Sequence, residues 1–384
     1  MNQRYYSLDV FRGATVALMI LVNNPGSWGH IFGPFEHAPW HGVTPTDLVF
    51  PFFLFAVGNA QAFVMPKFEQ AGTGAFLKKV LKRAVLIFAI GLFLNWSPFV
   101  KWQDGVLVGK PWETIRIMGV LQRIALCYLF GALIVFFIKK PKNIIVFSVL
   151  LLVVYWAISY WFGLPGDPYS LVGYFGTTVD KAILGENHLY RGEGVAFDPE
   201  GLASLLAAIV NVVGGYLVGN YIRKKGKNFD MLSHLFILGA VLMFVAYCWD
   251  MAFPMNKKIW TSSYVVYTVG LAAIILGIFI YLLEFKDAKG AWSRFFDVFG
   301  KNSLFIFVLS GFLPRVLALL RWTDHLDEQG KPVYTNAFGW FYEHICKNIS
   351  TDLRVGSLVY AFCMIAFYWS IVYVLDKKKI YIKV

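Results

Sequence analysis

The chain alternates long apolar runs with short polar and charged connections over its whole length. A helix needs about 20 mostly apolar residues to cross a bilayer, and this pattern predicts about ten such helices. We therefore expect an all-α integral membrane protein, folded as one bundle. The expected spans are residues 8–24, 46–65, 80–97, 114–138, 143–162, 200–222, 231–249, 260–283, 295–319 and 353–375.

The connections between the spans give little sign of further structure. We find no fixed-period repeat and no linker to a soluble domain, so residues 1–384 are expected to form a single polytopic domain. Two connections, 163–199 and 320–352, are long enough to hold a short helix or a lid. The first apolar run is short and leads into Asn23-Asn24-Pro25-Gly26, which is not typical of a cleaved signal peptide. The chain is therefore expected to start directly at its first span.

Composition supports the membrane class, and charge adds an orientation. Of the 384 residues 58% are hydrophobic and 15% are charged, and the mean hydropathy is +0.58. The net charge of +12 comes from Lys and Arg that concentrate in one alternate set of connections, the set that includes both chain ends. Because cytoplasmic loops carry this excess, both termini are expected in the cytoplasm and both long connections outside. The basic charge thus indicates topology rather than nucleic-acid binding. Three of the four cysteines lie in apolar runs, so no disulfide framework is expected.

The most distinctive polar stretch precedes the second span. Thr44-Pro45-Thr46-Asp47 predicts a helix start with Asp47 at a capping position, and His37 lies in the loop before it. An imidazole and a carboxylate at a membrane interface are suited to proton transfer. The alternatives are that Asp47 only caps the helix and that His37 is simply solvated. His37 and His41 lie in a Pro-containing loop with no third ligand, so no metal site is expected.

Polar residues inside the expected spans are a second signal, because a central Arg or Lys costs about 2.5–3.5 kcal/mol on insertion. Arg116 and Arg123 are expected on one helical face about 10 Å apart. We interpret Arg116 and Arg315 as interfacial anchors. Arg123 is expected either to bind a ligand or to form an internal salt bridge.

Two further polar stretches lie at expected spans. Asp198-Pro199-Glu200-Gly201 is expected to cap the sixth span, and Lys301-Asn302-Ser303 follows Gly300 within the ninth. Asn302 and Ser303 would either contribute to a site or bond between helices.

Seven short motifs follow one another along the chain: S-L-D-V-F-R-G (7–13), V-N (22–23), H-A-P-W-H-G (37–42), D-L-V-F-P-F-F (47–53), G-V-L-Q-R (119–123), D-P-E-G (198–201) and G-K-N-S-L (300–304). Taken together and in this order, over nearly the whole chain, they resemble the heparan-alpha-glucosaminide N-acetyltransferase family in a bacterial form. The resemblance implies a multi-span enzyme of the bacterial inner membrane. Such an enzyme takes acetyl from cytoplasmic acetyl-CoA and passes it to an amino sugar or glycan on the outer side.

The resemblance also implies site residues. The family's active histidine falls on His37, its following acid on Asp47 and its asparagine after the first span on Asn23. His37 would act as a base or be acetylated itself, and Asn23 or Asn24 would stabilise the oxyanion.

Ligand-binding residues are expected beside these. The candidates for the CoA phosphates are Arg123 and Lys301 with Asn302 and Ser303. The candidates for the acceptor are Trp40, His41 and Glu200.

Two other functions remain open at this point. One is a transporter for a sugar or anionic solute, although the absence of paired halves argues against it. The other is a structural subunit of an envelope-polysaccharide system. The expected partners are a glycan or amino-sugar acceptor and membrane lipids, without nucleic acid. The sequence leaves open N- versus O-acetylation and the oligomeric state, a homodimer included.

Overall fold

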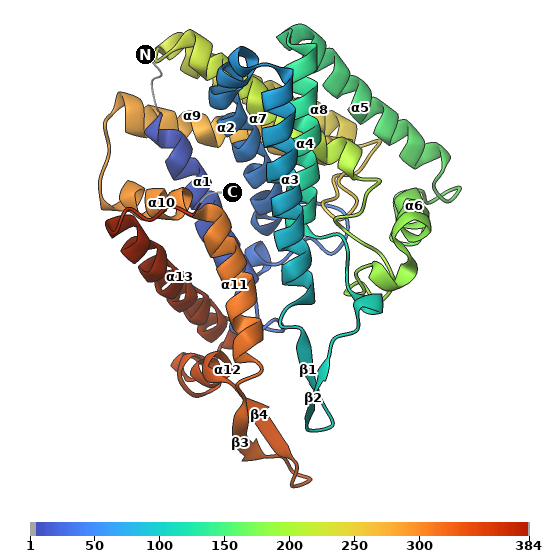
Figure 1. Ribbon diagram of the computed structural model, residues 1–384, viewed down its shortest axis with the longest axis vertical. Coiled ribbons are helices and arrows are strands. Elements are labelled where there is room, and N and C mark those ends of the chain that lie inside the picture. Colours follow the sequence, from blue (N-terminus) through green and yellow to red (C-terminus); the bar gives the residue numbers. More distant parts are fainter. Residues whose placement is uncertain (1–4, 383–384) are drawn as a thin grey trace.

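The computed structural model describes residues 5–382, and nearly all of the regular structure in this part is helical (Figure 1). The long helices are α1 (Tyr6–Asn23), α2 (Val49–Ala71), α3 (Thr73–Trp96), α4 (Val120–Ile138), α5 (Pro141–Trp161), α7 (Leu205–Lys225), α8 (Phe229–Asp250), α9 (Ser262–Ile280), α11 (Ser303–Leu317) and α13 (Leu353–Lys377). The shorter helices are α6 (Phe175–Leu184), α10 (Ala291–Lys301) and α12 (Ala337–Phe341).

Two antiparallel hairpins complete the architecture. In the first, β1 (Val100–Gln103) pairs with β2 (Val106–Gly109), and in the second β3 (Trp322–Leu326) pairs with β4 (Pro332–Thr335). Both hairpins project from the lower end of the molecule in Figure 1. Neither was expected from the hydrophobic pattern, because strands of four or five residues in connecting segments leave no periodic signal.

The prediction of an all-α membrane protein is confirmed. Among residues 5–382, eight helices are long and apolar enough to cross a membrane, or nine if the bent pair α10–α11 is one span. The expected span 295–319 is broken at Asn302, where the two helices meet at 77°. The expected span 80–97 lies within the 24-residue helix α3, which is not among the eight. The first half of α3 carries four basic residues, Lys78, Lys79, Lys82 and Arg83.

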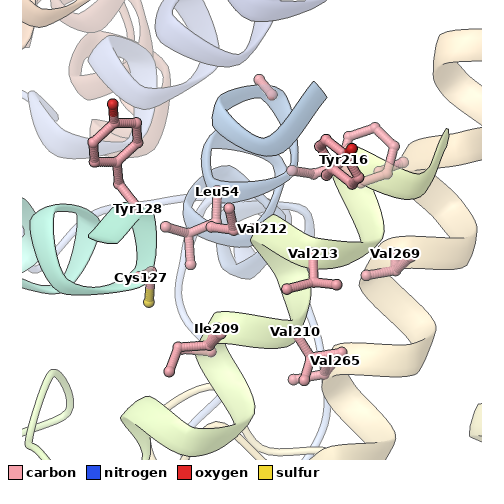
Figure 2. Packing of buried hydrophobic residues seen from close by; sticks show 14 of the residues in the cluster. Leu54, Cys127, Tyr128, Ile209, Val210, Val212, Val213, Tyr216, Val265 and Val269 are labelled. Atoms are coloured by element: carbon pink, nitrogen blue, oxygen red, sulfur yellow. The ribbon is translucent and has the colours of Figure 1, made fainter. Parts of the chain in front are cut away.

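Helix α7 lies at the centre of the larger hydrophobic cluster and packs against α2, α4 and α9. Figure 2 shows Val212 and Val213 of α7 between Leu54 of α2 and Val269 of α9. Glycines bring the α2 and α7 backbones into contact: a Cβ atom at Gly58 would lie 1.8 Å from the Val212 carbonyl oxygen. Small residues permit such close crossings where apolar lipid gives helices no other reason to associate.

A second close crossing joins α1 to α10. A Cβ atom at Gly13 would lie 1.7 Å from the Phe296 carbonyl oxygen, and one at Gly300 would lie 2.3 Å from that of Asp9. The Arg12 Nε donates to the Gly300 carbonyl at 2.8 Å, and its Nη2 donates to the Asp9 carboxylate at 2.7 Å. The first and last of the seven motifs therefore meet at this crossing.

The helix starts differ from the predictions at two functional segments. Helix α4 begins at Val120 because residues 115–119 are extended, and their backbone bonds to other parts of the chain. Asn95 Nδ2, for example, donates to the Arg116 carbonyl at 2.8 Å. Arg116 is thus not on the helix, and the prediction that it shares a helical face with Arg123 is wrong. Helix α7 begins at Leu205, so the prediction that Asp198–Gly201 caps this helix is also wrong.

The two long connections both contain short helices. Of the two expectations for these segments, a short helix or a lid, the structure shows the short helix. Residues 163–199 contain α6, and residues 320–352 contain α12 together with the second hairpin. The chain order places the end of α1, the starts of α2, α4 and α7, and the connection between α8 and α9 at one end of the bundle. The polar residues discussed next gather at this end.

Candidate active site

The loop before α2 brings His37 and Asp47 together. The His37 Nδ1 lies 2.6 Å from the Asp47 Oδ1. The His37 side chain is 46% exposed, whereas Asp47 is 1% exposed. A buried carboxylate thus holds an imidazole that a substrate can reach.

Asp47 also fixes the loop that carries His37. Its Oδ2 accepts from the backbone N–H groups of Ala38 at 3.1 Å and Thr44 at 3.0 Å. The residues from Thr44 to Asp47 form the expected capping box on a 3₁₀ turn, Pro45–Leu48. Capping and contact with His37 were alternatives in the sequence, and here one carboxylate does both.

The protonation pattern of His37 follows from these partners. Asp47 accepts from donors at both oxygens, so it is acceptor-only and the His37 Nδ1 must carry the proton toward it. The Nε2 atom is then the acceptor in the neutral imidazole. Within residues 5–382, Nε2 makes no hydrogen bond, which leaves it open to a substrate.

A cavity of about 130 Å³ lies beside His37. Its polar lining residues are Asn23, His37, Thr46, Glu200 and Lys257. Asn23 ends α1 and makes no side-chain hydrogen bond in the described part of the chain. The Asn24 amide, in contrast, donates to the Ile20 carbonyl at 2.9 Å. Of the two asparagines considered for the oxyanion, the structure brings only Asn23 to the cavity.

A charged cluster reaches this cavity through Glu200 and Lys257, which line it. Arg116 binds the Asp198 carboxylate through two nitrogens, at 2.9 and 2.6 Å, and also contacts Glu200. The other oxygen of Glu200 lies 3.6 Å from the Lys257 Nζ. The interpretation of Arg116 as an interfacial anchor is therefore wrong: its partners are two buried carboxylates rather than the membrane interface.

Burial and charge act in opposite directions on this cluster. Burial alone would raise the pKa of Glu200, but the positive charges of Lys257, Arg116 and Arg123 lower it to about 2. Burial would likewise lower the pKa of Arg116, while Glu200 and Asp198 raise it. Glu200 and Arg116 are consequently both charged at neutral pH.

Arg123 lies deeper than the cluster, in the first turn of α4. It is fully buried, and its Nη2 donates to the Gly201 carbonyl at 2.8 Å and to the Ser204 hydroxyl. Its guanidinium lies 5.0 Å from the Trp260 ring. Its Nε and Nη1 have no hydrogen-bond partner among the described residues. The geometry gives no direct salt bridge to Arg123, and the two free nitrogens would suit an anionic or carbonyl group.

The other cofactor candidates are not brought to Arg123. The Lys301 ammonium lies 2.7 Å from Asp297 and 3.1 Å from Asp376. Asn302 bonds the backbone near the C-terminus, donating to the Ile380 carbonyl and accepting from the Ile382 N–H. Ser303 begins α11 at the same bend. This group joins α10 to the C-terminal end of α13 and shares no partner with Arg123.

Trp40 and His41 lie near the loop but do not line the cavity. The Trp40 indole donates to the Tyr169 carbonyl at 2.8 Å, and its ring packs against Phe197. Partial burial lowers the pKa of His41, against the pull of Asp167 and Asp250. A role for either residue in acceptor binding stays a prediction.

Comparison with known proteins points to the same family as the motifs. A family model described as heparan-alpha-glucosaminide N-acetyltransferase, catalytic, matches residues 4–179. The heparan-alpha-glucosaminide N-acetyltransferase of Mus musculus is 27% identical over 438 residues, covering 99% of this chain and 60% of the relative. The Homo sapiens protein of the same name is 28% identical over 358 residues, covering 79% of this chain and 52% of the relative.

The chain is thus similar to the heparan-alpha-glucosaminide N-acetyltransferase family, through a family model over residues 4–179 and through relatives that are 27–28% identical. The match covers only part of each relative, 60% of the Mus musculus protein and 52% of the Homo sapiens protein. The segment matched by the family model includes Asn23, His37, Asp47 and Arg123, while Glu200 and Lys257 lie beyond it. These matches support the resemblance inferred from the seven motifs.

Two residues at or behind the cavity were missed by sequence reasoning. Lys257, which lines the cavity, was not singled out, and Asp198, which binds Arg116 behind it, was expected only as part of a helix cap. The available signal was the D-P-E-G motif itself, because two carboxylates beside membrane spans need cationic partners. Nothing in the local sequence identifies Arg116 and Lys257 as those partners, since they lie on separate connections.

Proposed function

We propose that this integral membrane protein transfers acetyl from acetyl-CoA to an amino-sugar or glycan acceptor, with His37 at the reacting centre. The observation that carries the proposal is the open His37 Nε2 at a cavity, with Nδ1 held by buried Asp47. The names of the relatives support acetyl transfer to nitrogen.

The residues at the cavity supply the parts of such a reaction. A neutral His37 takes the proton from the attacking amine at Nε2, and Asp47 stabilises the imidazolium that forms. The Asn23 amide and the Lys257 ammonium supply positive charge for the developing oxyanion. Acetyl-CoA brings a thioester whose thiolate leaves without strong acid assistance. His37 can also carry the acetyl group itself, which would divide the transfer into two steps.

Arg123 and Lys301 differ in whether their charge is available to the CoA phosphates. Arg123 fits an anionic group, because two of its buried nitrogens have no partner among the described residues. Lys301 offers no free charge, since two carboxylates already neutralise it. We therefore propose Arg123 ahead of Lys301, Asn302 and Ser303 as the residue that responds to CoA.

The direction of transfer rests on charge bias. The end of the bundle that carries His37 is the one expected outside, and the Lys- and Arg-rich connections lie at the opposite end. We propose that the acetyl donor comes from the cytoplasm, that the acceptor lies on the outer face, and that the membrane is a bacterial inner membrane.

The test is transfer of labelled acetyl from acetyl-CoA by the purified protein in lipid nanodiscs. The acceptors would be glucosamine and a glucosamine-terminated oligosaccharide, with glucose and N-acetylglucosamine as amine-free controls. Label that moves only to the amines and survives mild base supports N-acetylation; base-labile label on every sugar would indicate O-acetylation. No transfer together with no binding of acetyl-CoA would overturn the proposal and favour a transporter.

A further inference from the structure

A long apolar groove lies on the opposite side of α7 from α2. It has a volume of about 450 Å³ and is lined by α5, α7, α8 and α9. Gly214 and Leu217 of α7 form part of its floor, and Val149 of α5 and Leu238 of α8 are among its lipid-exposed walls. Figure 2 shows Val210 and Val265 at the α7–α9 contact that borders the groove.

The lining of the groove interior is suited to a hydrocarbon chain. Besides Tyr221 and His234 at one end, the lining includes the hydroxyl of Ser148, which already donates to the Ile144 carbonyl at 2.8 Å. No unpaired polar group therefore faces the remaining wall, and the groove offers only aliphatic surface there.

Its length matches one leaflet of a bilayer. The lining on α5 runs from Pro141 to Leu152, and that on α7 from Tyr221 back to Val210. Each is a rise of about 16 Å at 1.5 Å per residue. Half of a hydrocarbon core is about 15 Å, so the groove reaches from the membrane surface to the midplane.

The surface end of the groove is polar and basic. Tyr221 and His234 close it with a hydrogen bond between their side chains. The adjoining helix ends and connections carry seven basic residues: Lys139, Lys140, Lys142, Arg223, Lys224, Lys225 and Lys227. The acid at this end, Asp230, is bound to Lys225 at 3.0 Å and lies 3.5 Å from the His234 Nε2. Lys140, Lys142 and Lys224 make no ion pair in the described part of the chain, so the end is left with positive charge.

We propose that this groove binds one acyl chain of an anionic phospholipid from the cytoplasmic leaflet, with the head group among the basic residues at its end. Apolar length and charge both point to this occupant. Each Lys or Arg near an anionic head group strengthens lipid binding, and two lysines together raise the affinity by about tenfold or more.

The test is native mass spectrometry of the protein released from nanodiscs of equal phosphatidylglycerol and phosphatidylcholine. Wild type should retain one phosphatidylglycerol. Val149→Trp with Leu238→Trp should fill the groove and abolish retention. The matched control is Val154→Trp with Val245→Trp, at lipid-exposed positions on the same helices outside the groove, and it should retain lipid as wild type does.

The head-group half of the proposal has its own variant, which does not alter the apolar wall. Lys140→Gln with Lys224→Gln should lower the preference for phosphatidylglycerol over phosphatidylcholine by about tenfold or more. Equal retention of both lipids by wild type would overturn the proposal. So would undiminished retention by the filled variant, or a protein dimer that the filled variant alone abolishes.

Discussion

The Lys257 Nζ lies 3.6 Å from the Glu200 carboxylate at the wall of the cavity beside His37. Arg116 contacts the other oxygen of Glu200. Buried Glu200 therefore positions the Lys257 ammonium at the cavity, while Arg116 balances the negative charge of Glu200. Three segments that are remote in the sequence thus set the charge of the cavity. Removing the Lys257 side chain should mainly affect activity, whereas removing the Arg116 side chain should mainly affect stability.

Lys257→Ala should lower the rate of acetyl transfer without unfolding the protein. Loss of a charge-assisted contact in the transition state corresponds to about 1.5–3 kcal/mol, or about ten- to a hundredfold in kcat/KM. Lys257→Arg should restore part of the rate because it keeps the charge. Lys101→Ala, at an exposed position on β1, is the control and should match wild type. Wild-type kcat/KM in Lys257→Ala would remove Lys257 from the mechanism.

Arg116→Ala should mainly destabilise the fold. It leaves Asp198 and Glu200 buried without their partner, and breaking a buried pair costs about 3–5 kcal/mol. We expect a clear fall in the thermal unfolding midpoint in detergent, with partial recovery in a variant that also carries Asp198→Asn. An unchanged midpoint in Arg116→Ala would mean that the cluster contributes little to stability.

Gly13→Ala should weaken the α1–α10 crossing. Its Cβ atom would clash with the Phe296 carbonyl, and overpacking of this kind costs about 1–3 kcal/mol or more because backbone must move. Gly74→Ala on α3 is matched in chemistry, and its Cβ atom would meet nothing within 4 Å. The thermal midpoint should fall in the first variant only. Equal midpoints in both would show that the crossing is looser than the distances indicate.

Asp180 should give stability an unusual pH dependence. Burial raises the pKa of this α6 carboxyl to about 6, aided by Asp198, although the Leu202 and Ala203 backbone groups oppose the shift. The folded state therefore binds the proton more tightly than the unfolded state, whose pKa is near 3.8. Stability contributed by protonated Asp180 is lost as pH rises from about 4 to about 6, by up to about 3 kcal/mol.

Asp180→Asn tests this, since asparagine still accepts from the Leu202 N–H that binds Asp180 at 2.7 Å. The variant's unfolding midpoint should gain on wild type as pH rises from 4 to 7. Asp167→Asn, at an exposed loop position, should run parallel to wild type. Parallel curves for Asp180→Asn and wild type would show that Asp180 keeps an ordinary pKa in the folded protein.

Local sequence was sufficient for the membrane class and for the pairing of His37 with Asp47. Long apolar runs have one stable solution in lipid, and the capping signal of Thr44–Asp47 is contained in four residues. Asp47 lies only ten positions from His37, so a single turn brings them together. Asn23, by contrast, was expected at the site from the family resemblance, and it does line the cavity.

Long-range pairing was beyond that reasoning. Arg116 looked like part of a helix because apolar residues follow it. Its segment is instead held extended, because Asn95 donates to the Arg116 carbonyl and the Ile117 N–H donates to the His188 carbonyl. Lys257 resembles any loop lysine until Glu200 is placed beside it. The bend at Asn302 depends on contacts with residues near 380, which no window around residue 302 contains.

The central claim is that His37 handles the acetyl group while Asp47 positions it. Asp47→Asn should lower transfer because the imidazole loses its acceptor, and it should also weaken the capping box by about 1 kcal/mol. The unfolding midpoint must accordingly be measured beside the rate. Acid quench after mixing wild type with labelled acetyl-CoA alone separates the two routes: retained label that is absent from His37→Ala indicates acetyl-histidine, and no label indicates direct transfer.

The most direct measurement is the rate of acetyl transfer to glucosamine by His37→Ala, with its acetyl-CoA affinity and thermal midpoint recorded on the same preparation. His30→Ala, at an exposed position in the same connection between α1 and α2 and outside the cavity lining, is the matched control and should retain most of the rate. We predict that His37→Ala keeps its fold and its affinity for acetyl-CoA and loses about a hundredfold or more in rate. Transfer at the wild-type rate by folded His37→Ala would contradict the account.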